Sequence, residues 1–441
     1  MTAVAIIGAG YAGLACAVEL ARQDVEVTVF ERSRTLGGRA RIIRKDGWTV
    51  DNGQHLMIGA YAELTRLLRL TGVSPRQIKH FPLTLHIPGQ LHLRAAALPA
   101  PLHLLTGLIC ARGLSWRERF AICALLRHLK RRRFQLPAEM TVTELLTGCH
   151  QPPRLRNLLW EPLCLAALNT HAHEASAQIF ANVLRDTLAA TSASASELLI
   201  PRVDLSELFP VPAARYLATR NGNILTGNAI TAITPDNAGF RLVGAPGHRI
   251  WPQVVIATAP HHAVPLLDST GACPQLSAQI AALPSEPITT IYLAFGSGVA
   301  LPAPMIGLGE KPAQWAFDRG QCGEPEGLIA AVISAPRLEP KDRDAPIPAV
   351  INQLESALGR KLPEPQWTRV ITEKRATIAC RPGLARPGIA TPLPGLWLAG
   401  DYIESEYPAT LESAVRAGVR CAREIMGGKV SLQAEVSKQG S

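Results

Sequence analysis

The sequence has few aromatic side chains, which make up 5% of its 441 residues, and its nine cysteines are scattered. No two cysteines form a C-x-x-C pair, and no cysteine–histidine cluster has the spacing of a metal site. These absences argue against a zinc module and a dithiol redox centre. We expect no metal ion, and we expect reduced thiols in a cytoplasmic protein.

Long apolar runs are also missing. The apolar stretch at the N-terminus has no basic segment before it, which is not typical of a signal peptide. Residues 95–111 are rich in alanine and leucine, but Pro99, Pro101 and His103 interrupt a run already too short to span a bilayer comfortably. We therefore expect no transmembrane helix.

The chain has 45 basic and 35 acidic residues, a net charge of +10. Much of the excess lies in residues 112–133, where basic side chains alternate with Trp116, Phe120 and several leucines. This basic amphipathic pattern predicts contact with an anionic membrane surface rather than with nucleic acid, and hence peripheral attachment to the inner face of the cell membrane. A solvated helix face over a core stripe is an equally good interpretation.

The N-terminal residues follow the order of a dinucleotide-binding unit. Residues 3–7 are a short apolar run, typical of a strand buried on both faces. Residues 8–13 match G-x-G-x-x-G, and residues 14–23 continue as an alanine-rich helix. A second apolar strand, residues 25–30, ends at Glu31. Because all these features are in register, a chance match is a poor explanation.

Each glycine of this motif has its own task. Gly8 makes the tight turn, Gly10 lets the backbone approach a pyrophosphate, and Gly13 lets the helix pack closely on the sheet. The N-terminus of the helix offers N–H groups and a partial positive charge to the phosphates. Glu31 is expected to accept hydrogen bonds from a ribose diol.

The residues after Glu31 carry a resemblance. Arg32 follows directly, and residues 36–39 read Leu-Gly-Gly-Arg. This combination resembles the flavin amine oxidase and phytoene desaturase superfamily, in which the Gly-Gly-Arg segment passes the pyrophosphate. The resemblance implies cofactor-binding roles for Arg32, Gly38 and Arg39, and a guanidinium matches phosphate geometry.

The C-terminal part supplies the second half of such a site. A turn and an apolar strand end at Gly400 and Asp401, and a helix then opens near Thr410 and Leu411 and continues to about Met426. A glycine at a strand end admits a ligand, an acid binds polyol hydroxyls, and a helix N-terminus suits a flavin carbonyl. The same superfamily ends in this way, which favours FAD over NAD.

FAD is expected to be bound noncovalently. Cys380 precedes the Gly-Asp pair at a distance loosely like that in the monoamine oxidases, but Ala379 and Arg381 do not match their attachment motif. There is no second G-x-G-x-x-G and hence no resident nicotinamide domain. The reductant that recharges the FAD must come from elsewhere, and the sequence does not identify it.

Three further segments resemble one branch of the superfamily, the squalene-associated flavoenzymes that include the hydroxysqualene dehydroxylases of bacterial hopanoid synthesis. They are residues 51–61, 162–170 and 400–414. The resemblance implies an apolar C30 isoprenoid substrate whose hydroxyl is removed reductively to give squalene. A leucine- and alanine-rich middle section with few aromatics agrees with a long apolar tunnel.

The implied reaction requires a proton donor. Hydride from the reduced flavin reaches an allylic carbon while hydroxide departs, so a general acid near the flavin is expected. His55 is the first candidate, because it follows the turn that the superfamily brings to the flavin face. Glu404 and Glu406 are the second candidates. For each of the three, a structural hydrogen bond is at least as good an interpretation.

Other functions remain open at this stage. A carotenoid-type desaturase would take hydride from an isoprenoid, the reverse direction. An amine oxidase would want an aromatic or polar cage for its cationic substrate, and the aromatics are not concentrated in that way. A redox flavoprotein without turnover is a third class. Flavin reduction or reoxidation by defined isoprenoids separates them.

The sequence predicts an α/β protein with a Rossmann-like FAD-binding domain and a discontinuous α+β substrate-binding domain, because 441 residues exceed one compact core. The expected FAD-binding parts are residues 1–75, 197–283 and 384–428. The expected substrate-binding parts are residues 76–196, a helical insert that faces the membrane, and residues 284–383, a mixed sheet; residues 429–441 are expected to be a frayed tail.

Overall fold

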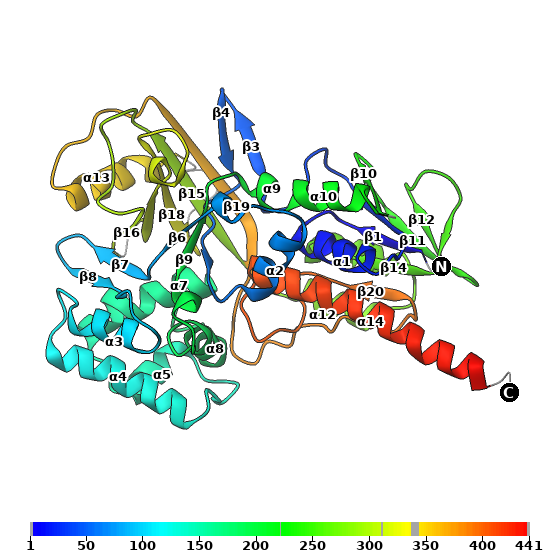
Figure 1. The fold of residues 1–441 in the computed structure, drawn as a ribbon, viewed down its shortest axis with the longest axis horizontal. Helices are drawn as coiled ribbons and strands as arrows, with labels where there is room; N and C mark the ends of the chain where they lie inside the picture. The colour runs from blue at the N-terminus through cyan, green and yellow to red at the C-terminus, as the bar shows by residue number, and fades with distance from the viewer. Residues whose placement is uncertain (1–2, 221, 310–311, 337–343, 439–441) are drawn as a thin grey trace.

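A computed structural model describes residues 3–220, 222–309, 312–336 and 344–438. A parallel sheet with strand order β10-β2-β1-β14-β20 forms one end of the molecule (Figure 1). Its strands come from three separate stretches of the chain: β1 Val4–Ile7, β2 Val27–Glu31, β10 Gly222–Thr226, β14 Gln253–Ile256 and β20 Leu396–Leu398.

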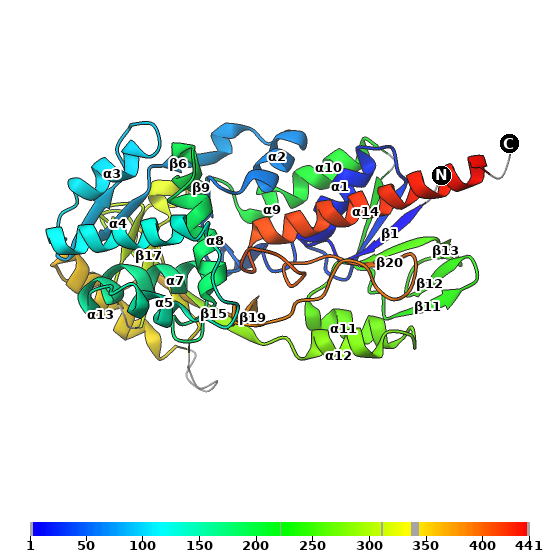
Figure 2. The same cartoon turned by 90° about the horizontal axis from the view of Figure 1, so that it is seen from below.

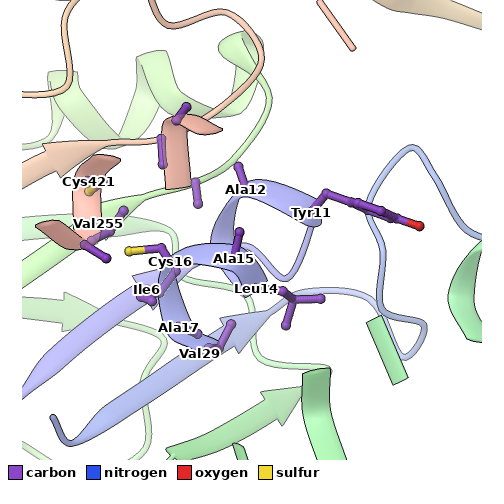
Figure 3. Close-up of a cluster of buried hydrophobic side chains, with 14 of the residues drawn as sticks. Ile6, Tyr11, Ala12, Leu14, Ala15, Cys16, Ala17, Val29, Val255 and Cys421 are labelled. Atoms are coloured by element: carbon purple, nitrogen blue, oxygen red, sulfur yellow. The ribbon is translucent and has the colours of Figure 1, made fainter. Parts of the chain in front are cut away.

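Helices cover this sheet because its central strands are apolar on both faces. All residues of α1, Tyr11–Ala21, are buried, and α1 packs against α10, Pro210–Ala218, and α14, Leu411–Lys438. The α1–α14 crossing is close, since a Cβ atom on Gly418 would lie 2.1 Å from the Ala12 carbonyl oxygen. Figure 3 shows Cys16 of α1 pointing toward Cys421 of α14.

Helices α11, Pro260–Asp268, and α12, Pro274–Ala281, lie on the side of the molecule opposite α1 and α10 (Figure 2). A small antiparallel sheet adjoins this end, formed by β11 Ala232–Asp236, β12 Gly239–Val243 and β13 Ile250–Trp251. Strands β11 and β12 form a hairpin, and β13 pairs with the other edge of β12.

The C-terminal helix is longer than expected. The sequence predicts an end near Met426 and a frayed tail at residues 429–441, but α14 continues to Lys438; residues 439–441 lie outside the described part. A glycine inside a helix costs only about 1 kcal/mol relative to alanine. Gly427 and Gly428 therefore do not stop a helix that the preceding residues have already established.

A five-stranded antiparallel sheet, in the order β16-β17-β18-β15-β19, forms the centre of the other end. Alternate residues of β15 and β18 belong to two different hydrophobic cores. One core lies between the sheet and α13, Pro346–Leu358, and the other lies between the sheet and the helices of residues 102–187. Period-two alternation thus lets one sheet serve two hydrophobic layers. The strands are β15 Ser285–Ala294, β16 Met305–Gly307, β17 Trp315–Asp318, β18 Leu328–Ser334 and β19 Trp367–Ile378.

The helical insert expected at residues 76–196 begins with strands instead. The first is β6, Ile78–Phe81, and the next two, β7, Thr84–Ile87, and β8, Leu91–Arg94, pair as a hairpin whose turn includes Gly89 at φ +70°. Their apolar residues alternate with polar ones, which is the period of a half-buried strand and not of a helix. Helices follow: α3 Leu102–Ile109, α4 Trp116–Arg131, α5 Val142–Gly148, α6 Pro153–Leu155, α7 Glu161–Leu168 and α8 Ala177–Thr187.

Several short elements connect the two ends. They are β3 Ile42–Lys45, β4 Trp48–Asp51, β5 Met57–Ile58, α2 Ala62–Leu70, β9 Leu198–Pro201 and α9 Leu205–Leu208. None of the described helices combines the length and the apolar character needed to cross a bilayer.

Candidate functional site

The turn from β1 into α1 contains two kinds of glycine. Gly8 has φ +108°, and a Cβ atom there would lie 2.8 Å from the Ala257 carbonyl oxygen; at Gly13 it would lie 2.0 Å from the Gly8 oxygen. These two glycines are required by the fold itself. A Cβ atom on Gly10, by contrast, would meet no atom of the described chain within 4 Å. Gly10 therefore borders open space that a ligand can occupy.

The N-terminus of α1 is suited to an anion. Gly10 is its N-cap, and no side chain of the described residues caps the helix there. The next glycine pair lies against this turn: the Gly37 N–H donates to the Ala9 carbonyl at 2.9 Å, and a Cβ on Gly38 would lie 3.3 Å from the Gly10 Cα. Free N–H groups and the helix dipole meet at one point, which is the geometry that binds a phosphate.

Glu31 stands at the end of β2, as predicted, and it also holds the surrounding loops. Its carboxylate accepts the N–H groups of Ala9 and Ser33, both at 2.8 Å. A carboxylate has about four acceptor sites, so capacity remains for a ribose diol. Arg32 is exposed, and its Nη1 lies 3.2 Å from Nε2 of His262 on α11.

Arg39 joins the two halves of the site. Its Nη2 lies 2.5 Å from Asp401 Oδ1, and its Nη1 donates to the Ala376 carbonyl of β19 at 2.7 Å. The sequence predicted cofactor roles for Arg39 and Asp401 separately, and the structure brings them into one ion pair. This pairing was not visible in the sequence, because 362 positions separate the two residues.

Buried hydroxyls without partners lie beside these segments. Tyr402 follows Gly400 and Asp401, is fully buried, and has no hydrogen-bond partner for Oη among the described residues. Burial raises the pKa of Tyr402, so the phenol stays protonated. The buried Oγ1 of Thr258, next to the Gly8 turn, also lacks a partner in the described chain. Such groups are costly unless a ligand or water satisfies them, so this cradle fits a polar dinucleotide.

The start of α14 is held in place by reciprocal bonds. Thr410 Oγ1 accepts the Ser413 N–H at 3.2 Å, and the Thr410 N–H donates to Ser413 Oγ at 2.8 Å. Leu411 is the first residue of the helix. The buried carboxylate of Glu412 accepts the Glu63 and Leu64 N–H groups at 3.0 and 2.9 Å, which caps α2 from α14. Sequence reasoning missed this capping role, which links distant segments.

Residues 51–55 join the cofactor segment to the substrate sheet. Asn52 Nδ2 donates to the Arg39 carbonyl at 3.0 Å, and the Gln54 N–H donates to Thr290 Oγ1 of β15 at 3.2 Å. His55 lies on this loop, with Nδ1 3.0 Å from the Gly53 carbonyl oxygen. A carbonyl only accepts, so Nδ1 carries the proton in this contact and Nε2 is the acceptor of the neutral ring.

The surroundings of His55 favour its neutral form. Burial lowers the pKa of His55 below its ordinary value, and the positive charges of Arg39 and Arg319 act in the same direction. The other two acid candidates lie elsewhere: Glu404 is exposed, and the Glu406 side chain is 69% exposed and pairs with Arg185 at 3.1 Å. Of the three candidates, only His55 belongs to the loop between the cofactor segment and the sheet.

A buried ion pair behind this loop was missed by sequence reasoning. Arg319 Nη2 lies 3.6 Å from Asp51 Oδ2, and Arg319 Nη1 donates to Gln54 Oε1 at 3.0 Å. Asp51 Oδ1 also accepts the Leu205 N–H at 2.9 Å. Burial raises the pKa of Asp51 to about 7, while Arg319 opposes that shift. Arg319 belongs to no motif, so nothing in the sequence pointed to this contact.

Comparison with known proteins agrees with this geometry. The sequence profile described as flavin containing amine oxidoreductase matches residues 11–426. Hydroxysqualene dehydroxylase of Rhodopseudomonas palustris is 28% identical over 433 residues, covering 95% of this chain and 97% of that protein. The 15-cis-phytoene desaturase of Synechococcus elongatus is 24% identical over 467 residues, covering 98% and 97%.

Among solved structures, an oxidoreductase from Methanosarcina mazei matches with a TM-score of 0.75 and 17% identity, covering 96% of this chain and 100% of that one. At this identity the likeness shows the fold alone. The expected α/β fold with a Rossmann-like domain is confirmed.

Proposed function

The chain belongs to the flavin containing amine oxidoreductase family, and from this premise we propose that it uses FAD to remove the hydroxyl of hydroxysqualene and give squalene. Family membership makes it a flavin-dependent oxidoreductase; the substrate and the direction of hydride transfer are the proposal. The observation that carries it is the match, over 95% of the chain, to a protein named hydroxysqualene dehydroxylase.

The cradle supports FAD as the flavin. The open space at Gly10 and the uncapped start of α1 suit a pyrophosphate, and Glu31 suits a ribose. Asp401 and the start of α14 would hold the flavin half. When bound and reduced, FAD supplies the hydride for the reaction.

Binding of FAD is proposed to be noncovalent. Cys380 is fully buried, with its N–H bonded to Thr170 Oγ1 at 3.0 Å and its Sγ 3.6 Å from Arg386 Nη2. Burial raises the pKa of the Cys380 thiol, which disfavours the nucleophilic thiolate.

The protein's own contribution to the chemistry is a proton and a dry, oriented site. The C–O bond breaks as hydride joins the carbon, and a proton on the departing oxygen gives water, so the step balances. His55 is the proposed donor. Because burial lowers the pKa of His55, its protonated form is a minor species at neutral pH and a better proton donor than an ordinary imidazolium. We therefore expect the rate to increase as pH falls.

The test is a single rapid turnover without oxygen. Enzyme with chemically reduced flavin is mixed with hydroxysqualene, and we expect flavin reoxidation together with squalene. Deuterium placed at the flavin N5 should appear in the squalene, provided that turnover is faster than exchange with solvent. The control is the same reduced enzyme mixed with squalene, which should leave the flavin reduced.

The second candidate is a carotenoid-type desaturase, which the likeness to 15-cis-phytoene desaturase favours. Oxidised enzyme that takes hydride from a saturated isoprenoid, without turnover of the alcohol, would establish it and overturn the reductive proposal. If neither substrate changes the oxidation state of the flavin, the protein would instead be a redox flavoprotein that does not turn over isoprenoids.

A further inference from the structure

The exposed large hydrophobic side chains of the described residues are concentrated in one short stretch of the chain. Phe120 is 70% exposed and Trp116 is 60% exposed, and Leu98, Leu102, Leu105 and Ile109 are also exposed. At the other end of the molecule, Val243 is the one side chain of this kind in the described part. Scattered exposed apolar residues are normal, but such a concentration marks an interaction surface.

Helix α3 presents an apolar face to solvent. Leu102, Leu105 and Ile109 are three and four positions apart, so they share one side of the helix. The helix is pressed onto the end of β8, where a Cβ atom on Gly107 would lie 2.5 Å from the Arg94 carbonyl oxygen. Because the backbones are this close, α3 is held with Leu102, Leu105 and Ile109 turned outward.

The outward face of α4 is half apolar and half basic. Ile122, Leu125 and Leu129 are buried and define its inner face. The opposite side, at 100° per residue, carries Trp116 and Phe120 in the first turns and Arg127 and Arg131 in the later ones, all of them exposed. This is the pattern of a helix that lies at a membrane interface, with aromatic residues near the lipid and arginines near the phosphates.

The two helices are joined rigidly. His92 of β8 and Arg112 of the connecting loop exchange backbone hydrogen bonds at 3.0 and 2.9 Å. Ser115 and Glu118 form a capping box at the start of α4, and the other Glu118 oxygen pairs with Arg154 at 2.8 Å. The exposed side chains therefore stand on a fixed platform and not on a loose loop.

We propose that this surface docks on a lipid bilayer with anionic headgroups. It consists of Leu98, Leu102, Leu105, Ile109, Trp116, Phe120, Arg127 and Arg131, and we call it the α3–α4 platform. The apolar side chains enter the outer part of the acyl layer, and the two arginines contact lipid phosphates. Charge favours this partner over a second copy of the chain, because a copy would present the same positive face.

A pocket of about 850 Å³ lies behind the platform. Leu98 of the platform and His103 of α3 both line it. Its other walls include Leu83 of the β6–β7 connection and Ser196. A ligand that leaves the bilayer at Leu98 would enter this pocket, whose walls also include the polar side chains of His80, Arg94 and Glu197. This entry route rests on the isoprenoid substrate proposed above, whereas docking itself does not.

Docking is tested by flotation of the flavin-loaded protein with vesicles of phosphatidylcholine and phosphatidylglycerol. The vesicle partition coefficient of the Leu105→Glu/Phe120→Glu variant should be at least about tenfold lower than that of wild type, because both positions lose apolar burial and gain repulsion from the anionic lipid. Val243→Glu is the matched control, since Val243 is 47% exposed and Leu105 is 46% exposed. Unchanged flavin content and circular dichroism establish that the variants are folded.

Equal binding of wild type and platform variant would overturn the proposal, as would an equal loss in Val243→Glu. A wild-type dimer that the platform substitutions dissociate, with vesicle binding intact, would instead make this face a contact between copies. A second measurement needs no disruptive change: brominated lipid should quench wild-type tryptophan fluorescence more than that of Trp116→Phe. Equal quenching would place Trp116 in water and contradict insertion.

The entry route has its own readout. With hydroxysqualene in detergent, wild type and the Leu105→Glu/Phe120→Glu variant should reoxidise reduced flavin at the same rate. With the same substrate in vesicles, the variant should be about tenfold slower, in line with its partitioning. A rate loss in detergent as well would contradict an entry role. Absence of reaction in both proteins in both media would instead count against the proposed function, with vesicle docking judged separately by flotation.

Discussion

The two ends of this molecule are specified by different kinds of constraint. At the cofactor end, single backbone atoms decide: a Cβ atom on Gly8 or Gly13 would lie 2.8 or 2.0 Å from a carbonyl oxygen, so a side chain at either position has no room. On the exposed surface of the α3–α4 end, by contrast, whole helix faces carry apolar or basic character. Close backbone contacts fix residue identities in short motifs, whereas a surface fixes only the chemical class of its side chains.

The contrast continues in the contacts that join the two ends. Beside the cofactor cradle, Arg39 is partly accessible and its partner Asp401 is buried, whereas Asp51 and Arg319 are both almost fully buried behind the cradle. Buried charges are tolerated only where partners surround them. We therefore expect a single substitution in the joining region to change both cofactor binding and the orientation of the substrate sheet.

The largest expected effect separates two glycines of one motif. Gly10→Val should fold normally but purify largely without FAD, because its side chain enters open space that the pyrophosphate needs. Gly13→Ala should instead destabilise the protein itself, because its Cβ would meet the Gly8 carbonyl oxygen at 2.0 Å. Flavin absorbance and the thermal midpoint of each variant are measured.

The proper reference is wild type stripped of its flavin. Gly10→Val should have the midpoint of this apoprotein, and Gly13→Ala should melt below it. A fully flavinylated Gly10→Val variant would contradict the assignment of this turn, and an unchanged midpoint in Gly13→Ala would break the distinction between fold-required and ligand-required glycines.

The next effect concerns the joining loop. His55→Ala should slow reoxidation of reduced flavin by hydroxysqualene about a hundredfold, the lower range for loss of a general acid, and retain the flavin. Because burial lowers the pKa of His55, the wild-type rate should keep rising as pH falls below the range in which an ordinary histidine titrates, and the variant should lose this dependence. An unaffected rate would remove His55 from the mechanism and turn attention to Glu404 and Glu406.

What the sequence predicted correctly is mostly local. The strand–turn–helix order around Gly8 follows from steric rules that act within a few residues, so the motif was readable. The contacts that were missed are long-range: Asp51 with Arg319, and Glu412 with the start of α2. Charge pairs of this kind leave no spacing pattern, because the fold alone brings the partners together.

The errors in the predicted elements have local causes as well. The insert was expected to be helical, yet its first strands are short, and four alternating residues are a weak signal beside the leucine-rich helices that follow. The end of α14 was placed near Met426 because two glycines follow, but the propensity difference between glycine and other residues is too small to stop the helix there. Candidate cofactor residues were found more readily than a proton donor, since protonation depends on burial that the sequence does not show.

A smaller effect tests the buried pair. Burial raises the pKa of Asp51 to about 7 in the folded protein, whereas the pKa of an aspartate in the unfolded chain is about 4. Its stabilising contribution is therefore complete at low pH and declines as pH rises from about 4 to about 7. Asp51→Asn should lack this decline and keep an acceptor for the Leu205 N–H.

The measurement is the difference in thermal midpoint between wild type and Asp51→Asn at several pH values. It should change by several degrees across that window, corresponding to about 4 kcal/mol at most, because each of the three pKa units corresponds to about 1.4 kcal/mol. A constant difference would show that Asp51 keeps the same charge throughout, and that Arg319 outweighs burial.

The smallest effect per residue belongs to the basic end of α4, and it distinguishes charge from apolar insertion. Arg131, Arg132 and Arg133 are exposed, and each basic side chain near an anionic bilayer contributes about 1 kcal/mol. Replacing all three with glutamine should weaken binding to anionic vesicles by a few kcal/mol at most, about fivefold for each residue. Added salt should reproduce the loss in wild type, because charges at the surface are screened within about 10 Å at 0.1 M salt.

On neutral vesicles the triple variant should match wild type, whereas Leu105→Glu/Phe120→Glu should still bind more weakly, since apolar burial does not depend on lipid charge. Unchanged sedimentation of the triple variant with anionic vesicles would make this end of α4 a solvated helix face and leave docking to the apolar side chains alone.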